Sequence, residues 1–258
     1  VFGFTNPEIR NPVNSGSITH FERQINVQTG SCPKKPRKKS TTQQLFVDTS
    51  SRARMAQPPE PTGRRELFGG AITVDLPTRL VDVSDFRPVP DNQEVWTDAD
   101  RDESIIVELL ERVDVGPSDA EGAAAWFFRD LAAVNDASVE SGLSCISRTA
   151  VLTGEEHLPS LNGPFAHASM CVGTQTVAKG RDGDDARNDV EVVVVNVRLP
   201  QVRTDVLMTL NRATRVAPRS SADAPRAEEK REGASSAEAT AARVAATLRI
   251  RDWSLFGS

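Results

Sequence analysis

The sequence contains few of the residues that usually carry disulfides, metal sites or nucleophilic chemistry. Its 258 residues include three cysteines and three histidines. Cys32, Cys145 and Cys171 are far apart and form no Cys-x-x-Cys pair. This spacing disfavours both a zinc site and a disulfide framework, and it makes a reducing compartment the default.

The histidines do not belong to a motif for nucleophilic catalysis. Neither a serine nor a cysteine nucleophile motif accompanies His20, His157 or His167. His157 follows two glutamates in a polar stretch that is typical of a solvated loop. The glycine pair in Phe68-Gly69-Gly70 lacks the spacing of the common phosphate-binding fingerprints. We therefore expect a regulatory binding protein that performs no bond-making chemistry and needs no cofactor.

An acidic cluster formed by Asp98, Asp100, Asp102 and Glu103 has two interpretations. Its carboxylates could attract a divalent cation, but the stretch lacks the glycine and the terminal glutamate of an EF-hand loop. The alternative is a solvated approach to a helix N-terminus, where negative charge is favourable. We adopt the second interpretation and expect no metal site.

Long apolar runs are also missing, and the charges are unevenly distributed. No run approaches the roughly 20 residues that a membrane helix needs, and Val1 to Phe21 is too polar for a secretory signal. The first 54 residues hold nine basic and three acidic side chains, whereas the remainder holds 22 basic and 33 acidic ones. An acidic domain repels nucleic acid and anionic membranes but attracts a basic protein surface. The expected partner is therefore a protein, with neither nucleic acid nor membrane involved.

Composition divides the chain near residue 66. Residues 1–54 show no sustained hydrophobic period, and with the polar stretch up to Arg65 they predict a disordered basic leader and linker over 1–65. Met55 directly precedes the polar stretch, so the residues upstream are interpreted either as a basic localisation patch or as an extension that is not native. Residues 66–258 are predicted to form one α/β domain with a mobile loop near 214–233.

Hydrophobic alternation predicts the strands of this domain. Val190–Leu199 is apolar at both alternating sets of positions, as in a central strand that is covered on both faces. The short link 200–203 predicts an antiparallel hairpin with Thr204–Asn211. Further strands are predicted within Phe68–Pro77, 138–151 and 165–179.

Three segments have helical periodicity. A cap at Ser104 followed by apolar residues at i, i+4 and i+7 predicts a helix that Gly116 and Pro117 end. Capping boxes that begin at Ser118 and Ser235 predict two more helices. The sum is an α/β (α+β) fold in which helices pack on a largely antiparallel sheet, with an apolar tail over 252–257 that docks back on it.

The segment Val81–Trp96 is the best candidate for a functional loop. Pro88 and Pro90 forbid a helix and disfavour a central strand. Anchoring of the following apolar residues would hold Asp91 and Glu94 on a stiff loop that loses little entropy on meeting a partner. The alternative is a solvated acidic turn without a specific role.

Several stretches of the domain resemble one known family. They are Leu67–Ile72, Asp82–Val95, Glu103–Glu111, Arg198–Gln201 with Thr204, Asp205 and Asn211, Gly173–Gln175, Ala178-Lys179 and Ser254–Gly257. In these residues the sequence resembles the Mog-type Ran guanine-nucleotide release factors. It departs from the family pattern at Trp96, where tyrosine or phenylalanine is usual, in the loop near 214–233, and in residues 1–54.

The resemblance implies a fold, a partner and a site. The implied fold is PsbP-like, an antiparallel sheet with helices on both faces. The implied partner is the small GTPase Ran, with Asp91 and Glu94 at the centre of the binding surface. We include neighbouring polar residues of the same loop as candidate contacts: Asn92, Gln93, Asp85 and Arg87.

The implied function is release of guanine nucleotide from Ran in support of nuclear protein import. We then expect a monomer in the nucleus and cytoplasm that a second Ran-binding protein can join. Two alternatives remain open. One is a PsbP-like structural subunit of a photosynthetic complex, and the other is an acidic adaptor for a different basic protein.

Overall fold

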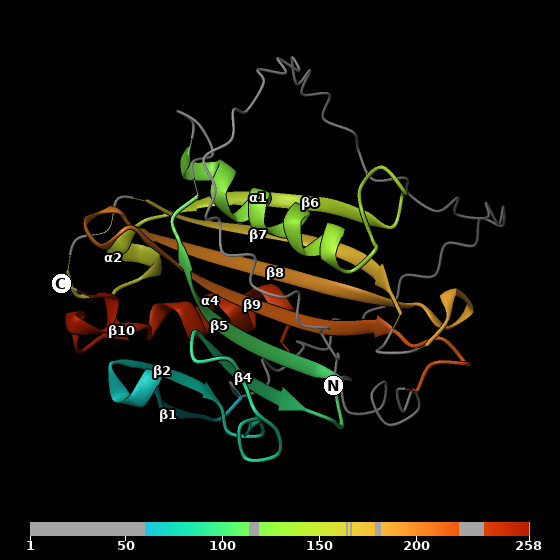
Figure 1. Cartoon of the computed structure of the whole chain (residues 1–258), viewed down its shortest axis with the longest axis horizontal. Helices are drawn as coiled ribbons and strands as arrows, with labels where there is room; N and C mark the ends of the chain where they lie inside the picture. Colours follow the sequence, from blue (N-terminus) through green and yellow to red (C-terminus); the bar gives the residue numbers. More distant parts are fainter. Residues whose placement is uncertain are drawn as a thin grey trace, which may run out of the picture. The chain divides into compact units, whose positions relative to one another are not determined.

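The computed structural model describes residues 60–113, 119–163, 165, 167–178, 182–221 and 235–257, which belong to one compact unit of the chain. Its centre is a seven-stranded sheet in which every strand pair is antiparallel (Figure 1). In spatial order the strands are β3 (Val81–Asp82), β4 (Gln93–Asp98), β5 (Glu103–Glu111), β9 (Thr204–Arg215), β8 (Asn188–Leu199), β7 (His167–Val177) and β6 (Ser144–Leu152).

A smaller sheet packs with the large one. Its strands, in the order β1-β2-β10, are β1 (Thr62–Leu67), β2 (Ile72–Pro77) and β10 (Arg249–Ile250). The 3-10 turn η1 (Phe68–Gly70) joins β1 to β2, and its residues have φ values of 50°, 65° and 92°. Glycine reaches such positive φ angles without a Cβ clash, which is why Gly69 and Gly70 can close this turn.

Helices cover both faces of the large sheet (Figure 1). Helix α1 (Asp119–Val134) packs on one face, and α4 (Ala237–Ala246) packs on the other beside the small sheet. Strand β8 shows why two covers are needed, because Val192 and Val194 face the α1 core while Val193 and Val195 face the α4 core. The predicted fold class is thereby confirmed. Within the described residues, no helix is long and apolar enough to cross a membrane.

Several predicted elements are confirmed with small shifts. The β8–β9 hairpin turns through η3 (Pro200–Val202) and a left-handed Arg203. Helix α4 is capped by Ser236, whose hydroxyl accepts the N–H of Ala239 at 3.1 Å, and not by the predicted Ser235. The loop between β6 and β7 contains a short helix, α2 (Gly154–His157). The tail forms η4 (Trp253–Phe256), which packs against the core as predicted.

The helix predicted to begin at Ser104 is wrong, because Glu103–Glu111 forms strand β5. It pairs with β4 on one side and with β9 on the other. Its first apolar residues, Ile105 to Val107, are buried whichever face they point to, so they satisfy a helical and a strand pattern equally well. β-Branched residues favour the strand. Backbone hydrogen bonding with β4 and β9 then selects the strand over the helix.

The boundary of the domain also differs from the prediction. Residues 62–65, which the sequence places in a linker, lie in β1 and pair with β2. They are polar because β1 is an edge strand with an exposed outer face, so their composition resembles that of a linker. Strand β9 likewise continues through Thr214 and Arg215. The predicted leader before residue 60, the cap at Ser118 and loop residues 222–233 lie outside the described residues.

Candidate functional site

The loop between β3 and β4 is held in place by its own backbone and a small apolar cluster. The N–H of Val83 donates to the carbonyl of Val95 at 2.9 Å. The carbonyl of Val83 in turn accepts the N–H groups of Phe86 and Arg87, at 3.0 and 3.1 Å. The side chains of Val83 and Val95 are buried together with Ile106 and packed by Val89. The loop is therefore anchored at both ends, and Val95 is buried, which is the condition on which the sequence predicts a stiff loop.

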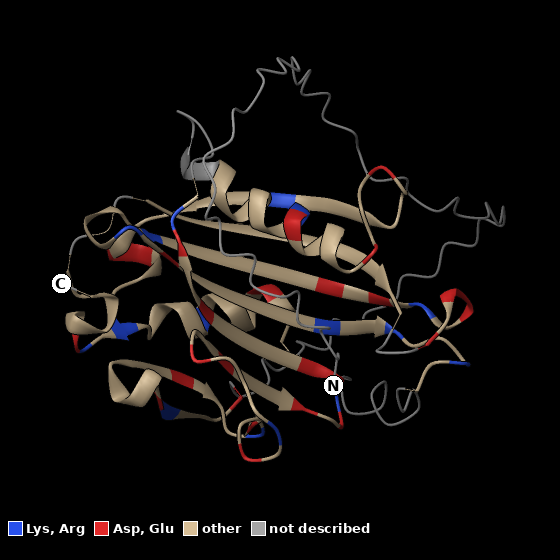
Figure 2. Ribbon diagram, in the orientation of Figure 1, with Lys and Arg blue, Asp and Glu red and all other residues tan. Residues whose placement is uncertain are grey.

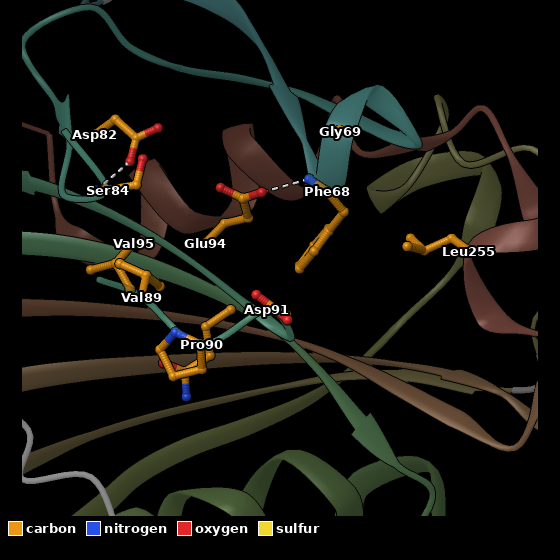
Figure 3. A pocket seen from close by; sticks show the side chains of 11 residues that line it. Phe68, Gly69, Asp82, Ser84, Val89, Pro90, Asp91, Glu94, Val95 and Leu255 are labelled. Atoms are coloured by element: carbon orange, nitrogen blue, oxygen red, sulfur yellow. Dashed lines mark hydrogen bonds between the residues drawn. The ribbon is translucent and has the colours of Figure 1, made fainter. Parts of the chain in front are cut away.

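Asp91 lies at the exposed end of this loop, in the turn that leads into β4. The N–H of Gln93 closes the turn by donating to the carbonyl of Pro90 at 2.9 Å. In Figure 3 the Asp91 carboxylate points toward the space between Phe68 and Glu94. Within the described part of the chain, no residue forms an ion pair or a hydrogen bond with this carboxylate. Its charge is available to a partner.

Glu94 is half-buried at the start of β4 and points into the same space. Its Oε1 accepts the backbone N–H of Phe68 at 2.5 Å. Burial raises the pKa of Glu94; the Phe68 hydrogen bond opposes this rise and the nearby Asp82 carboxylate adds to it. The Glu94 carboxylate is therefore less exposed than a carboxylate on a surface loop. Within the described structure it forms no ion pair that would neutralise its charge.

Asp91 and Glu94 border a pocket of about 390 Å³ (Figure 3). Three segments that are distant in sequence form it: the η1 turn, the β3–β4 region and the C-terminal η4. Its lining combines carboxylates with apolar side chains, from Phe68, Gly69, Asp82, Ser84, Val89, Pro90, Asp91, Gln93, Glu94, Val95 and Leu255. A third carboxylate, Asp82, accepts only the N–H of Ser84, at 2.8 Å, among the interactions that the described residues make.

The lining also includes residues that were not predicted to belong to the site, among them Phe68, Asp82 and Leu255. Phe68 and Leu255 lie in stretches that carry the family resemblance, but nothing local indicates that they approach Asp91. Asp82 ends the short strand β3. The antiparallel pairing of β3 with β4 places Asp82 opposite Trp96. Trp96 is two residues after Glu94 in β4, so the pairing brings Asp82 near Glu94. That pairing requires the tertiary structure.

The other predicted contacts divide into two groups. Asn92 and Gln93 hold β4 against β5: the Nδ2 group of Asn92 donates to the Leu109 carbonyl at 3.3 Å, and the Nε2 group of Gln93 donates to Glu108 at 2.7 Å. Both side chains are half-buried. Asp85 and Arg87 are exposed on the braced loop, outside the pocket lining.

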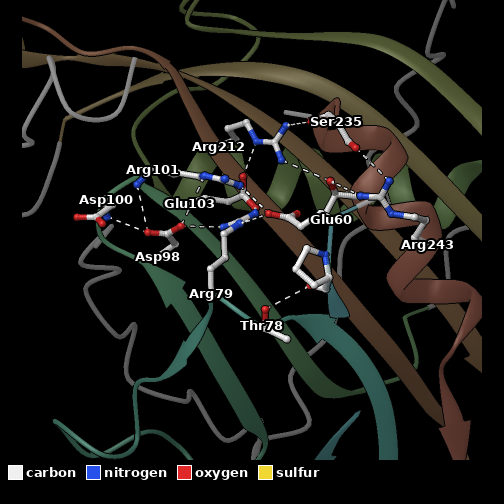
Figure 4. A network of polar contacts seen from close by, with 12 residues as sticks. Glu60, Thr78, Arg79, Asp98, Asp100, Arg101, Glu103, Arg212, Ser235 and Arg243 are labelled. Carbon is white, nitrogen blue, oxygen red and sulfur yellow. Dashed lines mark hydrogen bonds and ion pairs between the residues drawn. The ribbon is translucent and has the colours of Figure 1, made fainter. Parts of the chain in front are cut away.

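The acidic cluster after β4 has a structural role that the sequence prediction missed. Asp98 and Glu103 do not approach a helix N-terminus; they bind the guanidinium of Arg79, with an Nη1 to Asp98 distance of 3.1 Å (Figure 4). Arg212 also contacts Glu103, at 2.5 Å. Asp98 is the last residue of β4 and Glu103 the first of β5, and Figure 2 shows acidic residues where these two strands meet their connecting turn. Within the described residues, no group of three His, Cys, Asp or Glu side chains could hold a metal.

Glu60 extends this network to the first described residue. Its carboxylate accepts from Arg79 at 2.6 Å and from Arg101 at 2.7 Å. Burial by itself would raise the pKa of Glu60, but the hydrogen bonds and charges of Arg79 and Arg101 hold it below its ordinary value. The network joins Glu60, two residues before β1, to the β4–β5 turn and β9, and none of its acids lines the pocket.

The fold and the site together define an α+β protein with a preformed acidic pocket beside a braced loop. The family model described as "Ran-interacting Mog1 protein" matches residues 65–213. A zebrafish (Danio rerio) relative, "Ran guanine nucleotide release factor", is 37% identical over 164 residues, which is 62% of this chain and 83% of the relative. The chain therefore belongs to the Mog1 family.

Two further comparisons agree with this membership. The "Nuclear import protein mog1" of Schizosaccharomyces pombe is 34% identical over 148 residues, covering 57% of this chain and 74% of the relative. The crystal structure of the Saccharomyces cerevisiae Ran-binding protein Mog1p superposes with a TM-score of 0.53 at 24% identity, covering 77% of this chain and all of that one. The second comparison shows that the fold is shared.

Proposed function

We propose that this protein binds the small GTPase Ran and promotes release of its guanine nucleotide, in support of nuclear protein import. The observation that carries the proposal is the pocket bordered by Asp91 and Glu94, which lies within the segment matched by the family model. The names of the zebrafish and fission yeast relatives support it. The protein then acts in the nucleus and cytoplasm, as a regulatory binding protein and not as an enzyme.

The pocket has the chemistry to receive a basic side chain of the partner. Asp82, Asp91 and Glu94 supply negative charge without a cation of their own among the described residues. Phe68 and Leu255 supply apolar surface for an aliphatic stem. Because the loop is braced before binding, little conformational entropy is lost when the partner docks.

Nucleotide release follows if these carboxylates compete for cationic groups that hold phosphate in Ran. The effect is limited by differential binding: the protein can accelerate release only by as much as it prefers weakly loaded or empty Ran over tightly loaded Ran. Asp91 is exposed and meets the partner first, and Glu94 contributes a second charge that its Phe68 hydrogen bond holds in one orientation.

The direct test is release of labelled nucleotide from Ran with and without this protein. The double variant Asp91→Asn with Glu94→Gln removes both charges, while the amide introduced at position 94 keeps an oxygen that accepts the Phe68 N–H. We expect Ran binding and accelerated release to be lost with the melting temperature nearly unchanged. The matched control is Glu155→Gln with Glu156→Gln, two exposed acids of α2 that lie outside the pocket lining.

The same experiment separates the alternatives. A structural subunit of a photosynthetic complex, or an adaptor for another basic protein, has no reason to distinguish nucleotide states of Ran. An affinity that is equal for loaded and nucleotide-free Ran, with no acceleration of release, would reject the proposal. A monomer, and the joining of a second Ran-binding protein, are tested by the mass of the complexes in solution.

A further inference from the structure

Phe86 is a large apolar side chain in an unusual place. It is 77% exposed, the highest fraction among the large hydrophobic side chains that the structure describes as exposed. It lies in the turn between β3 and β4, between the polar residues Asp85 and Arg87. Single exposed apolar residues are common on protein surfaces, so exposure alone carries no conclusion. The residues around Phe86 are the evidence for a functional role.

The backbone fixes Phe86 in this exposed position. Its own N–H donates to the carbonyl of Val83 at 3.0 Å, and the N–H of Arg87 donates to the same carbonyl. The Asp82 carboxylate accepts the N–H of Ser84, which closes the start of the turn. These hydrogen bonds hold the backbone of the turn that carries the exposed ring.

The turn that carries Phe86 is also a wall of the acidic pocket. Ser84 and Val89, on either side of Phe86 in the chain, both line it. Asp82, Asp91 and Glu94 line the same pocket, so the segment from residue 82 to residue 94 carries both the exposed ring and three carboxylates of the pocket. Protein interfaces commonly combine an aromatic residue that becomes buried with a polar surround that fixes orientation.

We propose that Phe86 is the apolar anchor of the Ran-binding surface. Its ring inserts into an apolar depression on the GTPase, next to the basic groups that bind Asp91 and Glu94. This inference rests on the proposed function and adds a binding determinant to it. Because the pocket is negatively charged, the partner surface that binds it must be basic. The exposed ring further requires an apolar depression within that surface.

The two kinds of contact have different kinetic roles. Charges at an interface steer the encounter, so they set the association rate and its dependence on salt. An aromatic ring that is desolvated only in the final complex acts mainly on dissociation. Phe86 should therefore control how long the complex lasts, and the acidic residues should control how fast it forms.

The test measures association and dissociation of Ran and the full chain at several salt concentrations. For Phe86→Ser we expect dissociation to be at least about tenfold faster, as for an interface hot spot, with the salt dependence of association unchanged. Phe86→Leu, which retains apolar bulk, should recover most of the affinity. The control is Val139→Ser, which changes an apolar side chain of 45% exposure in a different turn.

The outcomes distinguish this inference from the function on which it rests. If Phe86→Ser binds Ran as the unsubstituted chain does, while Asp91→Asn with Glu94→Gln weakens binding, Phe86 is not an anchor and the proposed function stands. If Phe86→Ser lowers affinity only by slowing association, the assigned role is wrong. If the unsubstituted chain does not bind Ran, the proposed function and this inference both fail.

Discussion

The backbone N–H of Phe68 donates to the carboxylate of Glu94 at 2.5 Å, across 26 positions of the chain. This bond ties the η1 turn of the small sheet to the start of β4 in the large one. It also explains how a half-buried glutamate without an ion pair in the described structure keeps one orientation. Glu94 therefore belongs to the framework of the pocket as well as to its charged surface.

The raised pKa of Glu94 predicts a pH dependence of partner binding. Because burial raises this pKa, the folded protein takes up the proton at a higher pH than the unfolded chain does. Protonation thus favours folding below the unfolded pKa, and this contribution is lost as the pH rises through the folded pKa. Binding has the opposite dependence, since only ionised Glu94 attracts a cation.

We expect affinity for Ran to fall on acidification at a higher pH than an ordinary glutamate would give. Calorimetric titrations across a pH series check this. Glu94→Gln should bind more weakly at neutral pH and should lose this part of the pH dependence, whereas Asp91→Asn should retain it. An unchanged pH profile in Glu94→Gln would show that another group titrates.

The buried ion pair of Arg198 and Asp205 should be sensitive to loss of one partner. The side chains are 3% and 0% exposed, and Nε lies 2.9 Å from Oδ1. Asp205 also accepts the N–H of Val113. Asp205→Ala leaves a buried guanidinium without its charge partner, which should cost about 3–5 kcal/mol in free energy of unfolding. Denaturant titration measures this directly.

A surface pair in the same part of the fold provides the control for that substitution. Arg203 and Glu111 form a 3.1 Å contact with side chains that are 81% and 75% exposed. Glu111→Ala should change the free energy of unfolding by less than about 1 kcal/mol because solvent screens the pair. If Asp205→Ala and Glu111→Ala lowered the free energy of unfolding equally, the larger contribution expected of the buried Arg198–Asp205 pair would be wrong.

Two glycine substitutions should change stability in opposite directions. A Cβ at Gly173 in β7 would lie 2.5 Å from the Cys145 carbonyl and 2.5 Å from the Phe128 ring. Gly173→Ala should therefore destabilise the fold by about 1–3 kcal/mol through overpacking. A Cβ at Gly122 in α1 would meet nothing within 4 Å, so Gly122→Ala should stabilise by about 0.5–1 kcal/mol. Thermal melts decide both signs.

The position of β1 predicts where the domain can be shortened. A chain that starts at Glu60 keeps β1 and the contacts of Glu60 with Arg79 and Arg101. A chain that starts at Glu66, the boundary predicted from sequence, loses most of the β1 pairing with β2. The second chain should unfold at a clearly lower denaturant concentration. Equal midpoints would show that residues 60–65 add nothing to the domain.

Local hydrophobic patterns predicted the correct element where the apolar residues fit only one period, that of a strand or that of a helix. The alternation over Val190–Leu199 correctly predicts a doubly covered central strand, and the apolar spacing after Ser235 predicts α4. The pattern after Ser104 predicts the wrong element, because a short run of Ile, Val and Leu fits both periods. Pairing with β4 and β9, which the sequence does not display, decided for a strand.

Residue types alone predict a stiff loop around Pro88 and Pro90 that carries Asp91, and they carry the family resemblance. They do not show that Glu94 lies in β4, or that Phe68, Asp82 and Leu255 join Asp91 and Glu94 around one pocket. The difference lies in the range of the interactions. Proline and turn residues act on their immediate neighbours, whereas the pocket depends on strand pairing and packing between segments that are distant in the chain.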